Sequence, residues 1–258
     1  MTTPCLYYLS IADVSEVFLR LRVFCYDEEM VAKDQHIKLI VKKLEHEVLD
    51  YWTVVFDRPA GFVFEAGDWI DIEFSDGPRK GGKTYSISSS PSEVDIKITF
   101  REGLSEFKRS LQTIQPHDEV YISQYGNDYD FQLNRNRSSV LIAGGVGIAP
   151  FRSMVKEMAD NHDMNDVSLM YLNQNENFLF KSELDRWATQ LSNLSITYIN
   201  TKDINRKKRE KLIQSLIDDI SQNFYISGPP AMVEANEHLL IDMGVQIRNI
   251  RIDSFGGY

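Results

Sequence analysis

The segment best suited to chemistry is a glycine-rich turn, Gly144-Gly145-Val146-Gly147-Ile148-Ala149-Pro150. It follows the short apolar run Val140–Ala143, and Pro150 is a residue favoured in the first turn of a helix. Glycines let the backbone approach a phosphate closely, and a strand-to-helix turn is the setting that a nucleotide-phosphate loop requires. The segment therefore predicts a nucleotide-binding loop, with a purely structural tight turn as the alternative.

A second candidate is the polar strand that begins Lys83-Thr84-Tyr85-Ser86-Ile87-Ser88. Because side chains alternate along a strand, Lys83 and Tyr85 share one face and Ser86 points to the other. The lysine offers a positive charge to a phosphate, the tyrosine offers a phenol and an aromatic face, and the serine offers a hydroxyl. An ordinary strand with polar residues facing water is the alternative.

Two more turns carry groups that suit a ligand. Gly103-Leu104-Ser105 opens a predicted helix, where backbone N–H groups and the helix dipole favour an anion, and Arg101 stands close by as a further cation. Ser227-Gly228-Pro229-Pro230 follows a predicted strand, at the carboxyl edge of a sheet where ligands bind. For the first of these turns, a plain helix cap is the alternative.

The first half of the chain is predicted to be mostly strands, because residues 36–101 are rich in β-branched and aromatic residues between turn signals. The predicted strands are Ile37–Leu44, Tyr51–Phe56, Trp69–Phe74, Thr84–Ser88 and Val94–Arg101. Short strands at this spacing favour an antiparallel β-barrel. A helix over Leu104–Leu111 and a strand over Glu119–Ile122 complete this part.

After about Asn136 the pattern changes to alternating strands and helices. The predicted strands are Val140–Ala143, Val167–Leu172, Ile196–Ile199, Phe224–Ser227 and Ile247–Ile252. The predicted helices begin near Pro150 and at a capping box, Ser182-Glu183-Leu184-Asp185, and cover Leu212–Ile220 and Met232–Met243. This alternation predicts a parallel sheet with helices on both faces.

The composition excludes several classes of protein. A net charge of -10 over 258 residues disfavours nucleic acid and anionic membranes as partners. No segment approaches the ~20 apolar residues of a membrane span. Asp13 and Glu16 interrupt the amino terminus where a signal peptide needs an apolar core, so a cytoplasmic protein is expected. Cys5 and Cys25 are too few for an iron–sulfur cluster, and the histidines show no metal-ligand spacing, so no metal is expected.

Taken in order, these segments and the closing Phe255-Gly256-Gly257-Tyr258 resemble the ferredoxin–NADP reductase superfamily. The resemblance covers roughly residues 36–258. It implies an antiparallel β-barrel domain that binds FAD over residues 36–135, followed by an α/β Rossmann-like domain with a parallel sheet that binds NAD(P) over residues 136–258. Residues 1–35 lie outside the resemblance, as an N-terminal segment of unknown role.

The resemblance also implies roles for individual residues. FAD contacts are expected from Lys83, Thr84, Tyr85, Ser86, Ile87, Ser88, Arg101, Gly103, Leu104 and Ser105. Nicotinamide-dinucleotide contacts are expected from Gly144, Gly145, Val146, Gly147, Ile148, Ala149, Pro150, Ser227, Gly228 and Pro229. Catalytic roles are expected for Ser86 at the flavin N5 edge, for Ser227 near the nicotinamide and for Tyr258 as the ring stacked on the flavin. Phe255 competes with Tyr258 for that stacking role, and a tail without a role is the alternative.

The choice between NADH and NADPH depends on charge near the ribose 2′-phosphate. Behind the strand Ile196–Ile199 lies a basic run that includes Lys202 and Arg206, whereas Asn173-Gln174-Asn175 after the preceding strand supplies no charge. The basic run favours NADPH, with a solvated loop and helix start as the alternative.

The function expected from the resemblance is that of a flavoprotein oxidoreductase, in which NAD(P)H passes a hydride to FAD and electrons then go to an unidentified acceptor. Glu234 and Asp253 are carboxylates that could lie near the site. One alternative is the electron-transfer flavin subunit of a larger complex, such as the partner of dihydroorotate dehydrogenase, although the cysteine cluster of that family is missing after Cys25.

A second alternative is a non-catalytic nucleotide-binding protein that has lost FAD. Three departures from the family pattern motivate it: Lys83 replaces the usual arginine, Ala149 replaces a threonine and Ser227 replaces a cysteine. A lysine keeps the charge of an arginine but loses its bidentate geometry.

Overall fold

The computed structural model describes residues 36–74 and 82–255. These residues belong to one compact unit that contains two sheets. The expectations for Cys5 and Cys25, for the N-terminal segment 1–35 and for Tyr258 lie outside the described residues.

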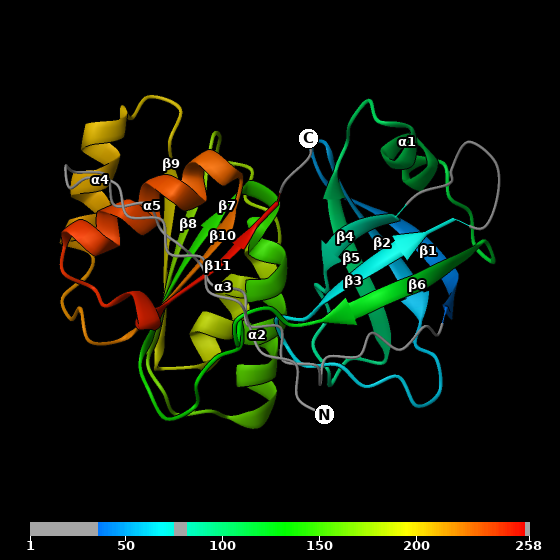
Figure 1. The fold of residues 1–258 in the computed structure, drawn as a ribbon, viewed down its shortest axis with the longest axis horizontal. Helices are drawn as coiled ribbons and strands as arrows, with labels where there is room; N and C mark the ends of the chain where they lie inside the picture. The colour runs from blue at the N-terminus through cyan, green and yellow to red at the C-terminus, as the bar shows by residue number, and fades with distance from the viewer. Residues whose placement is uncertain (1–35, 75–81, 256–258) are drawn as a thin grey trace, which may run out of the picture. The chain divides into compact units, whose positions relative to one another are not determined.

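The first sheet is antiparallel and has the strand order β4-β3-β6-β1-β2-β5 (Figure 1). Its strands are β1 (Ile37–Val48), β2 (Tyr51–Asp57), β3 (Trp69–Glu73), β4 (Gly82–Ser86), β5 (Asp95–Arg101) and β6 (Glu119–Gly126). A bridge between Ile87 and Ile98 links the chain just after β4 to β5 at the opposite edge, so the sheet curls into the predicted barrel. Helix α1 (Glu106–Gln112) lies between β5 and β6 in the sequence.

Alternation along these strands builds the barrel core. In β3, Ile70 and Ile72 are fully buried, while the residues that alternate with them are half-buried, namely Trp69, Asp71 and Glu73. The same period of two directs one side chain of each pair inward in the neighbouring strands. Helix α1 adds Phe107 and Leu111 to this core.

The second sheet is parallel and has the strand order β11-β10-β7-β8-β9. Its strands are β7 (Ser139–Gly144), β8 (Val167–Asn173), β9 (Leu194–Asn200), β10 (Asn223–Gly228) and β11 (Ile250–Ser254). Its helices are α2 (Ile148–Asn161), α3 (Lys181–Gln190), α4 (Arg206–Ser215) and α5 (Pro230–Asp242). After β7 the chain adds β8 and β9 on one side of that strand, and it then crosses over to add β10 and β11 on the other side. The order of strands therefore reverses between β7 and β10.

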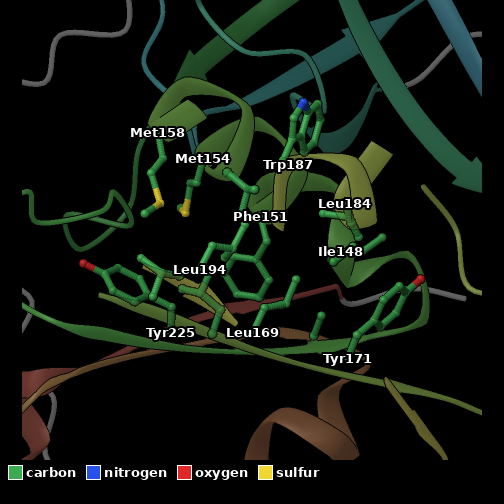
Figure 2. Close-up of a cluster of buried hydrophobic side chains, with 14 of the residues drawn as sticks. Ile148, Phe151, Met154, Met158, Leu169, Tyr171, Leu184, Trp187, Leu194 and Tyr225 are labelled. Atoms are coloured by element: carbon green, nitrogen blue, oxygen red, sulfur yellow. The ribbon is translucent and has the colours of Figure 1, made fainter. Parts of the chain in front are cut away.

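Each face of the parallel sheet is covered by its own pair of helices, α2 and α3 on one face and α4 and α5 on the other (Figure 1). Figure 2 shows the core under α2, where Phe151 and Met154 point toward Leu169 on β8 and Tyr225 on β10. The predicted doubly wound α/β architecture is therefore confirmed.

The start of α3 differs from the sequence prediction. The capping box at Ser182 is wrong, because the helix begins at Lys181 and its N-cap is Phe180, a residue with a left-handed φ of 60° and no side-chain cap. Ser182 and Glu183 lie inside the first turn, where Glu183 binds an arginine of α2.

Two boundaries were also wrong in the last third of the chain. Helix α4 begins at Arg206, well before the predicted Leu212, because the Asn205 side chain accepts the backbone N–H of Lys208 as an N-cap. The predicted strand over Ile247–Ile252 begins later, at Ile250, since Ile247–Asn249 form one turn of 3₁₀ helix.

Within residues 36–74 and 82–255 no helix has the length and apolar character that crossing a bilayer requires. The same residues contain no group of three or more His, Cys, Asp or Glu side chains placed to hold a metal ion.

The buried ring of Phe151 is expected to contribute strongly to stability, because it is fully buried and stacks on Phe131 with ring centroids 5.8 Å apart. Phe151→Ala should lower the free energy of unfolding by about 3–5 kcal/mol, from lost burial and the cavity left behind. Urea unfolding measures this loss. The matched control is Met164→Ala, at a side chain that is 82% exposed, where a change within about 0.5 kcal/mol is expected. Equal effects in the two variants would contradict the assignment of Phe151 to the core.

Candidate active site

The glycine-rich turn lies where the direction of the parallel sheet switches. Strand β7 ends at Gly144, Gly145–Gly147 form a 3₁₀ turn, and α2 begins at Ile148. A Cβ atom at Gly147 would lie 2.2 Å from the carbonyl oxygen of Ser227, so this turn can pack against the end of β10 only with glycine at that position. Gly145 has a left-handed φ of 55°, and its carbonyl accepts a hydrogen bond of 2.9 Å from the Tyr171 hydroxyl.

The end of β10 brings the second predicted turn to the same place. Ser227 and Gly228 are the last residues of β10, and Pro229 is the N-cap of α5. In the first turn of α2, Ile148, Ala149 and Pro150 are buried. The two turns predicted to hold a dinucleotide are therefore neighbours at the carboxyl edge of the sheet.

A pocket joins this edge to the barrel. Its lining consists of Lys83, Thr84, Tyr85, Ser86, Thr99, Phe100, Arg101, Ser105, Lys108, Val146, Ala149 and Phe255. Residues of β4 and β5 form one wall, and Val146 and Ala149 of the glycine-rich turn contribute to another. The polar strand and the glycine-rich turn, which are far apart in the sequence, thus share one pocket.

Three cations meet in this pocket, namely Lys83, Arg101 and Lys108. Burial lowers the pKa of Lys108, and the positive charges of Arg101 and Lys83 lower it further. Arg101 also forms an ion pair of 2.5 Å with Asp50. This group of charges suits an anionic ligand, because an anion would offset the repulsion between the cations.

Sequence reasoning missed Lys108, because its spacing in α1 was read only as part of the helical pattern. Ser105 is the N-cap of α1, and its hydroxyl accepts the backbone N–H of Lys108 at 3.3 Å. One helical turn separates the two residues, which places Lys108 beside the predicted Ser105. A basic residue three positions after a predicted anion contact was the available signal.

The aromatic face predicted at Tyr85 lies against Phe107, with ring centroids 6.3 Å apart in a stacked arrangement. Thr84 donates a hydrogen bond to Asp71 on the neighbouring strand β3. Four of the predicted FAD contacts are not among the residues that line the pocket, and of the predicted dinucleotide contacts only Val146 and Ala149 line it. Ile87 and Ser88 are fully buried in the barrel, whereas Gly103 is half-buried and Leu104 is 84% exposed.

A carboxylate lies beside both predicted catalytic serines. The Ser86 hydroxyl donates a hydrogen bond of 2.8 Å to Oδ2 of Asp253, and the Ser227 hydroxyl donates one of 3.4 Å to the same oxygen. Asp253 stands opposite Ser227 in the register of β10 and β11. Burial raises the pKa of Asp253 to about 6, even though both serine hydroxyls act to lower it.

The other carboxylate considered from the sequence lies elsewhere. Glu234 is exposed on α5, and its charge is one of the influences that raise the pKa of Arg206, behind the hydrogen bond and charge of Glu210. Within the exposed basic run, Arg206 forms an ion pair of 2.6 Å with Glu210. Lys202 is exposed two residues after the carboxyl end of β9.

The end of the described chain supplies an aromatic ring to the pocket. The backbone N–H of Phe255 donates a hydrogen bond of 3.1 Å to the carbonyl of Gly228, which holds the residue at the switch point. Its side chain lines the pocket together with Tyr85. Phe255 therefore lies in the pocket, while the competing Tyr258 lies outside the described residues.

The fold is an α/β domain joined to an antiparallel barrel, with a pocket lined by residues of both. Residues 141–238 match the family described as the oxidoreductase NAD-binding domain. The flavohemoglobin of Malassezia yamatoensis, solved with bound FAD and heme, has a similar fold with a TM-score of 0.73 and 18% identity, covering 86% of this chain and 60% of that one. A ferredoxin–NADP⁺ reductase from Neisseria gonorrhoeae, solved with bound FAD and NADP, has a TM-score of 0.71 and 18% identity over 84% of this chain and 97% of that one.

Two curated proteins are similar to this chain in sequence. The 2-halobenzoate 1,2-dioxygenase electron transfer component of Burkholderia cepacia is 32% identical over 59% of this chain and 48% of its own length. The NADH-cytochrome b5 reductase 1 of Scheffersomyces stipitis is 27% identical over 68% of each chain. The chain spans about half to two thirds of the length of the curated relatives that it matches. The chain therefore contains an oxidoreductase NAD-binding domain and has the two-sheet fold of the ferredoxin–NADP⁺ reductase and flavohemoglobin structures.

The half-buried Asp253, whose carboxyl has a raised pKa, is expected to make stability depend on pH. Because its pKa is about 6 in the folded protein and 3.8 ordinarily, the stability that its protonated form contributes is fully present below pH 3.8 and is lost as the pH rises through 6. Asn at this position does not titrate. The free energy of unfolding of Asp253→Asn, relative to that of the unsubstituted protein, should therefore rise by on the order of 2 kcal/mol between pH 4 and pH 7.

Urea unfolding at a series of pH values measures this difference, with Asp203→Asn, an exposed position, as the matched control. A difference between Asp253→Asn and the unsubstituted protein that stays constant with pH would show that Asp253 is not desolvated.

Proposed function

We propose that this chain is an FAD-dependent oxidoreductase that takes electrons from NAD(P)H and passes them to a separate acceptor. The observation that carries the proposal is the shared pocket, in which the polar strand of the barrel and the glycine-rich turn of the α/β domain line one space. The domain roles follow, with FAD held by residues 36–135 and the nicotinamide dinucleotide by residues 136–258. Bound FAD supplies hydride acceptance and the release of electrons singly or in pairs.

The residues of the pocket fit a flavin dinucleotide. Lys83, Arg101 and Lys108 can neutralise a pyrophosphate, and the pKa of Lys108, lowered by burial and by its neighbours, marks a place where a negative charge is favoured. Tyr85 and Phe255 offer aromatic surface to a planar ring system. The lysine at position 83 has a basic partner in Lys108, which compensates for the missing arginine of the family pattern.

Ser86, Asp253 and Ser227 are proposed to act at the reacting end of the site. The hydrogen bond to Asp253 fixes the orientation of the Ser86 hydroxyl, whose oxygen can then accept a hydrogen bond from a ligand. Ser227 is held toward the same carboxylate and keeps this end of the site polar. With a pKa of about 6, Asp253 can hold or release a proton near neutral pH.

The acceptor is proposed to be a separate oxygenase component. Several relatives bear names that describe this role, including a carnitine monooxygenase reductase subunit of Escherichia coli and a terephthalate 1,2-dioxygenase reductase component of Comamonas. These names favour the subunit-type alternative over a reductase with a small-molecule acceptor. They also argue against a non-catalytic protein.

The flavin site is tested by the purified protein and one variant. The full chain should be yellow, should release FAD on denaturation, and should lose its flavin absorbance when NADH or NADPH is added without oxygen. Tyr85→Ala should lower the FAD content at least severalfold, because the aromatic face in the pocket is lost. Tyr121→Ala, on β6 of the same barrel, is the matched control and should keep full FAD content. A colourless protein that binds no added FAD would refute the proposal.

The preference for NADPH is proposed to depend on Lys202, which is exposed beyond β9. Lys202→Ala should raise KM for NADPH by about tenfold and leave KM for NADH within twofold, since a hydrogen bond to a charged group contributes roughly 1.5–3 kcal/mol. Steady-state reduction of an artificial acceptor measures both constants. Lys207→Ala, also exposed in the basic run, is the matched control. Equal changes for NADH and NADPH would mean that Lys202 only faces solvent.

A further inference from the structure

We propose that Arg152 is a positioning residue that sets the distance and angle between the flavin strand of the barrel and the nucleotide loop of the α/β domain. The inference rests on the proposed function. It concerns a residue that has no place in the pocket itself and that the sequence pattern did not single out.

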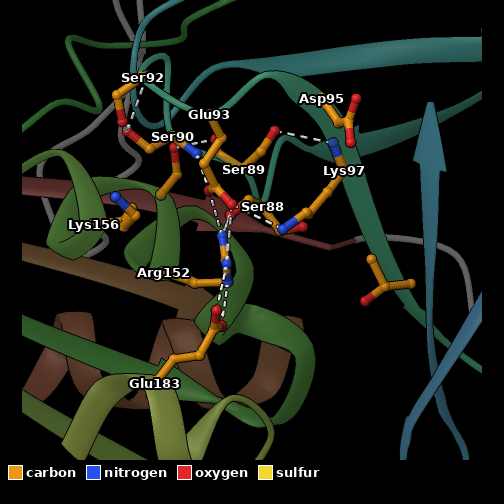
Figure 3. A network of polar contacts seen from close by, with 12 residues as sticks. Ser88, Ser89, Ser90, Ser92, Glu93, Asp95, Lys97, Arg152, Lys156 and Glu183 are labelled. Atoms are coloured by element: carbon orange, nitrogen blue, oxygen red, sulfur yellow. Dashed lines mark hydrogen bonds and ion pairs between the residues drawn. The ribbon is translucent and has the colours of Figure 1, made fainter. Parts of the chain in front are cut away.

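Arg152 is almost completely enclosed, with 2% of its surface exposed. Its Nε and Nη2 donate to the two carboxylate oxygens of Glu183 at 2.7 and 2.8 Å. Its Nη1 donates to Glu93 and to the carbonyl of Ser88, both at 2.8 Å, and Nη2 reaches the other oxygen of Glu93 at 3.3 Å. Figure 3 shows the guanidinium between Glu93 on one side and Glu183 on the other.

The partners of Arg152 belong to the segments that carry the two halves of the site. Ser88 follows two residues after the end of β4, the strand of Lys83, Tyr85 and Ser86. Arg152 itself lies in the second turn of α2, five residues after Gly147. One guanidinium therefore connects the flavin strand to the nucleotide loop through short, rigid segments.

Neighbouring contacts strengthen the same connection. The Ser153 hydroxyl donates a hydrogen bond of 2.6 Å to the carbonyl of Ser89, and Ser92 donates one to Asp160 at the far end of α2. These contacts run along α2 beside the turn at residues 88–93. The turn is thus held along the helix at several points, of which the contacts of Arg152 and Ser153 are buried.

The electrostatics require Arg152 to stay in place. Burial alone would raise the pKa of Glu93, but the hydrogen bonds and the charge of Arg152, with help from Lys97, lower it to about 2. The guanidinium also lies over the rings of Phe180 and Trp187, at 5.1 and 5.5 Å from their centroids. Contacts with two carboxylates and two aromatic rings therefore fix the position of the guanidinium.

A buried ion pair contributes more reliably to a fixed geometry than to net stability, because desolvation offsets much of the attraction. Bidentate contacts between arginine and carboxylate are directional, and lysine cannot reproduce them. Transfer between two bound groups is sensitive to position, and a displacement of about 1 Å can cost about a hundredfold in rate. Arg152 is therefore placed to act on hydride transfer through geometry alone.

The test compares Arg152→Met and Arg152→Lys with the matched control Lys97→Met, which removes the other cation on Glu93. Spin labels at Val63 and Met164, both strongly exposed, report the distance between barrel and α/β domain in protein without cofactors, with Cys5 and Cys25 replaced by serine. Stopped-flow measurement gives the limiting rate of flavin reduction and the nicotinamide dissociation constant.

Both Arg152 variants should broaden or shift the distance distribution and lower the limiting reduction rate at least tenfold, with FAD content and nicotinamide affinity within about twofold. Lys97→Met should leave the distance and the rate unchanged. A normal distance distribution in either Arg152 variant, or a normal rate despite a broadened one, would overturn the proposal. If Arg152→Met does not fold, Arg152→Lys decides.

The two proposals fail in distinguishable ways. If the unsubstituted protein binds no FAD or is not reduced by either nicotinamide, the proposed function is wrong. The distance measurement needs no cofactor, so it still decides whether Arg152 holds the two domains in one arrangement.

Discussion

The close packing of the glycine-rich turn against the end of β10 is the constraint on which the site depends. With a Cβ atom at Gly147 only 2.2 Å from the Ser227 carbonyl oxygen, no other residue fits unless the strands move apart. This packing brings the first turn of α2 and the Ser227–Gly228 strand end to the same point. A strand order that switches direction between β7 and β10 makes that point accessible to a ligand, since the helices that follow the two strands lie on opposite faces.

The charged residues near this point differ in their surroundings. Arg152 lies within the packed protein, where two carboxylates and a carbonyl satisfy it. Lys108 lies in the pocket, where burial and the neighbouring cations disfavour its charge. Asp253, near the switch point, has a raised pKa and receives two serine hydroxyls. The pocket therefore carries three cations in its lining, and the protonatable Asp253 is hydrogen-bonded to Ser86, another lining residue.

The sequence predicted the parts of the fold that local chemistry determines. The content of β-branched and aromatic residues between turn signals predicted β3 and its neighbours, and the run of glycines predicted the turn after β7, because both signals arise from a few adjacent residues. The start of α4 was missed because Arg206–Arg209 are charged and show no apolar period, and Asn205 was the only signal. The capping box at Ser182 failed because Phe180 begins the helix with a left-handed backbone, which no capping rule predicts.

The residues that sequence reasoning could not place are those whose partners are distant. Asp253 contacts Ser86 across 167 residues, and Arg152 contacts Ser88 across 64. No periodicity or spacing within a segment reports such pairs. Arg152 also lies in a helix whose apolar positions explain the pattern without it, so only the three-dimensional arrangement reveals that it is buried.

The separation of Ser86 from Asp253 has a consequence for how the protein is made. Chains fold from the amino end as they emerge during synthesis, so the barrel that carries Lys83, Arg101 and Lys108 is available first. Asp253 reaches Ser86 only when β11 has added to the edge of the parallel sheet, beside β10. A nascent chain therefore acquires its anion-binding surface well before its protonatable end. The contact between Ser86 and Asp253 is therefore absent until β11 has joined the parallel sheet.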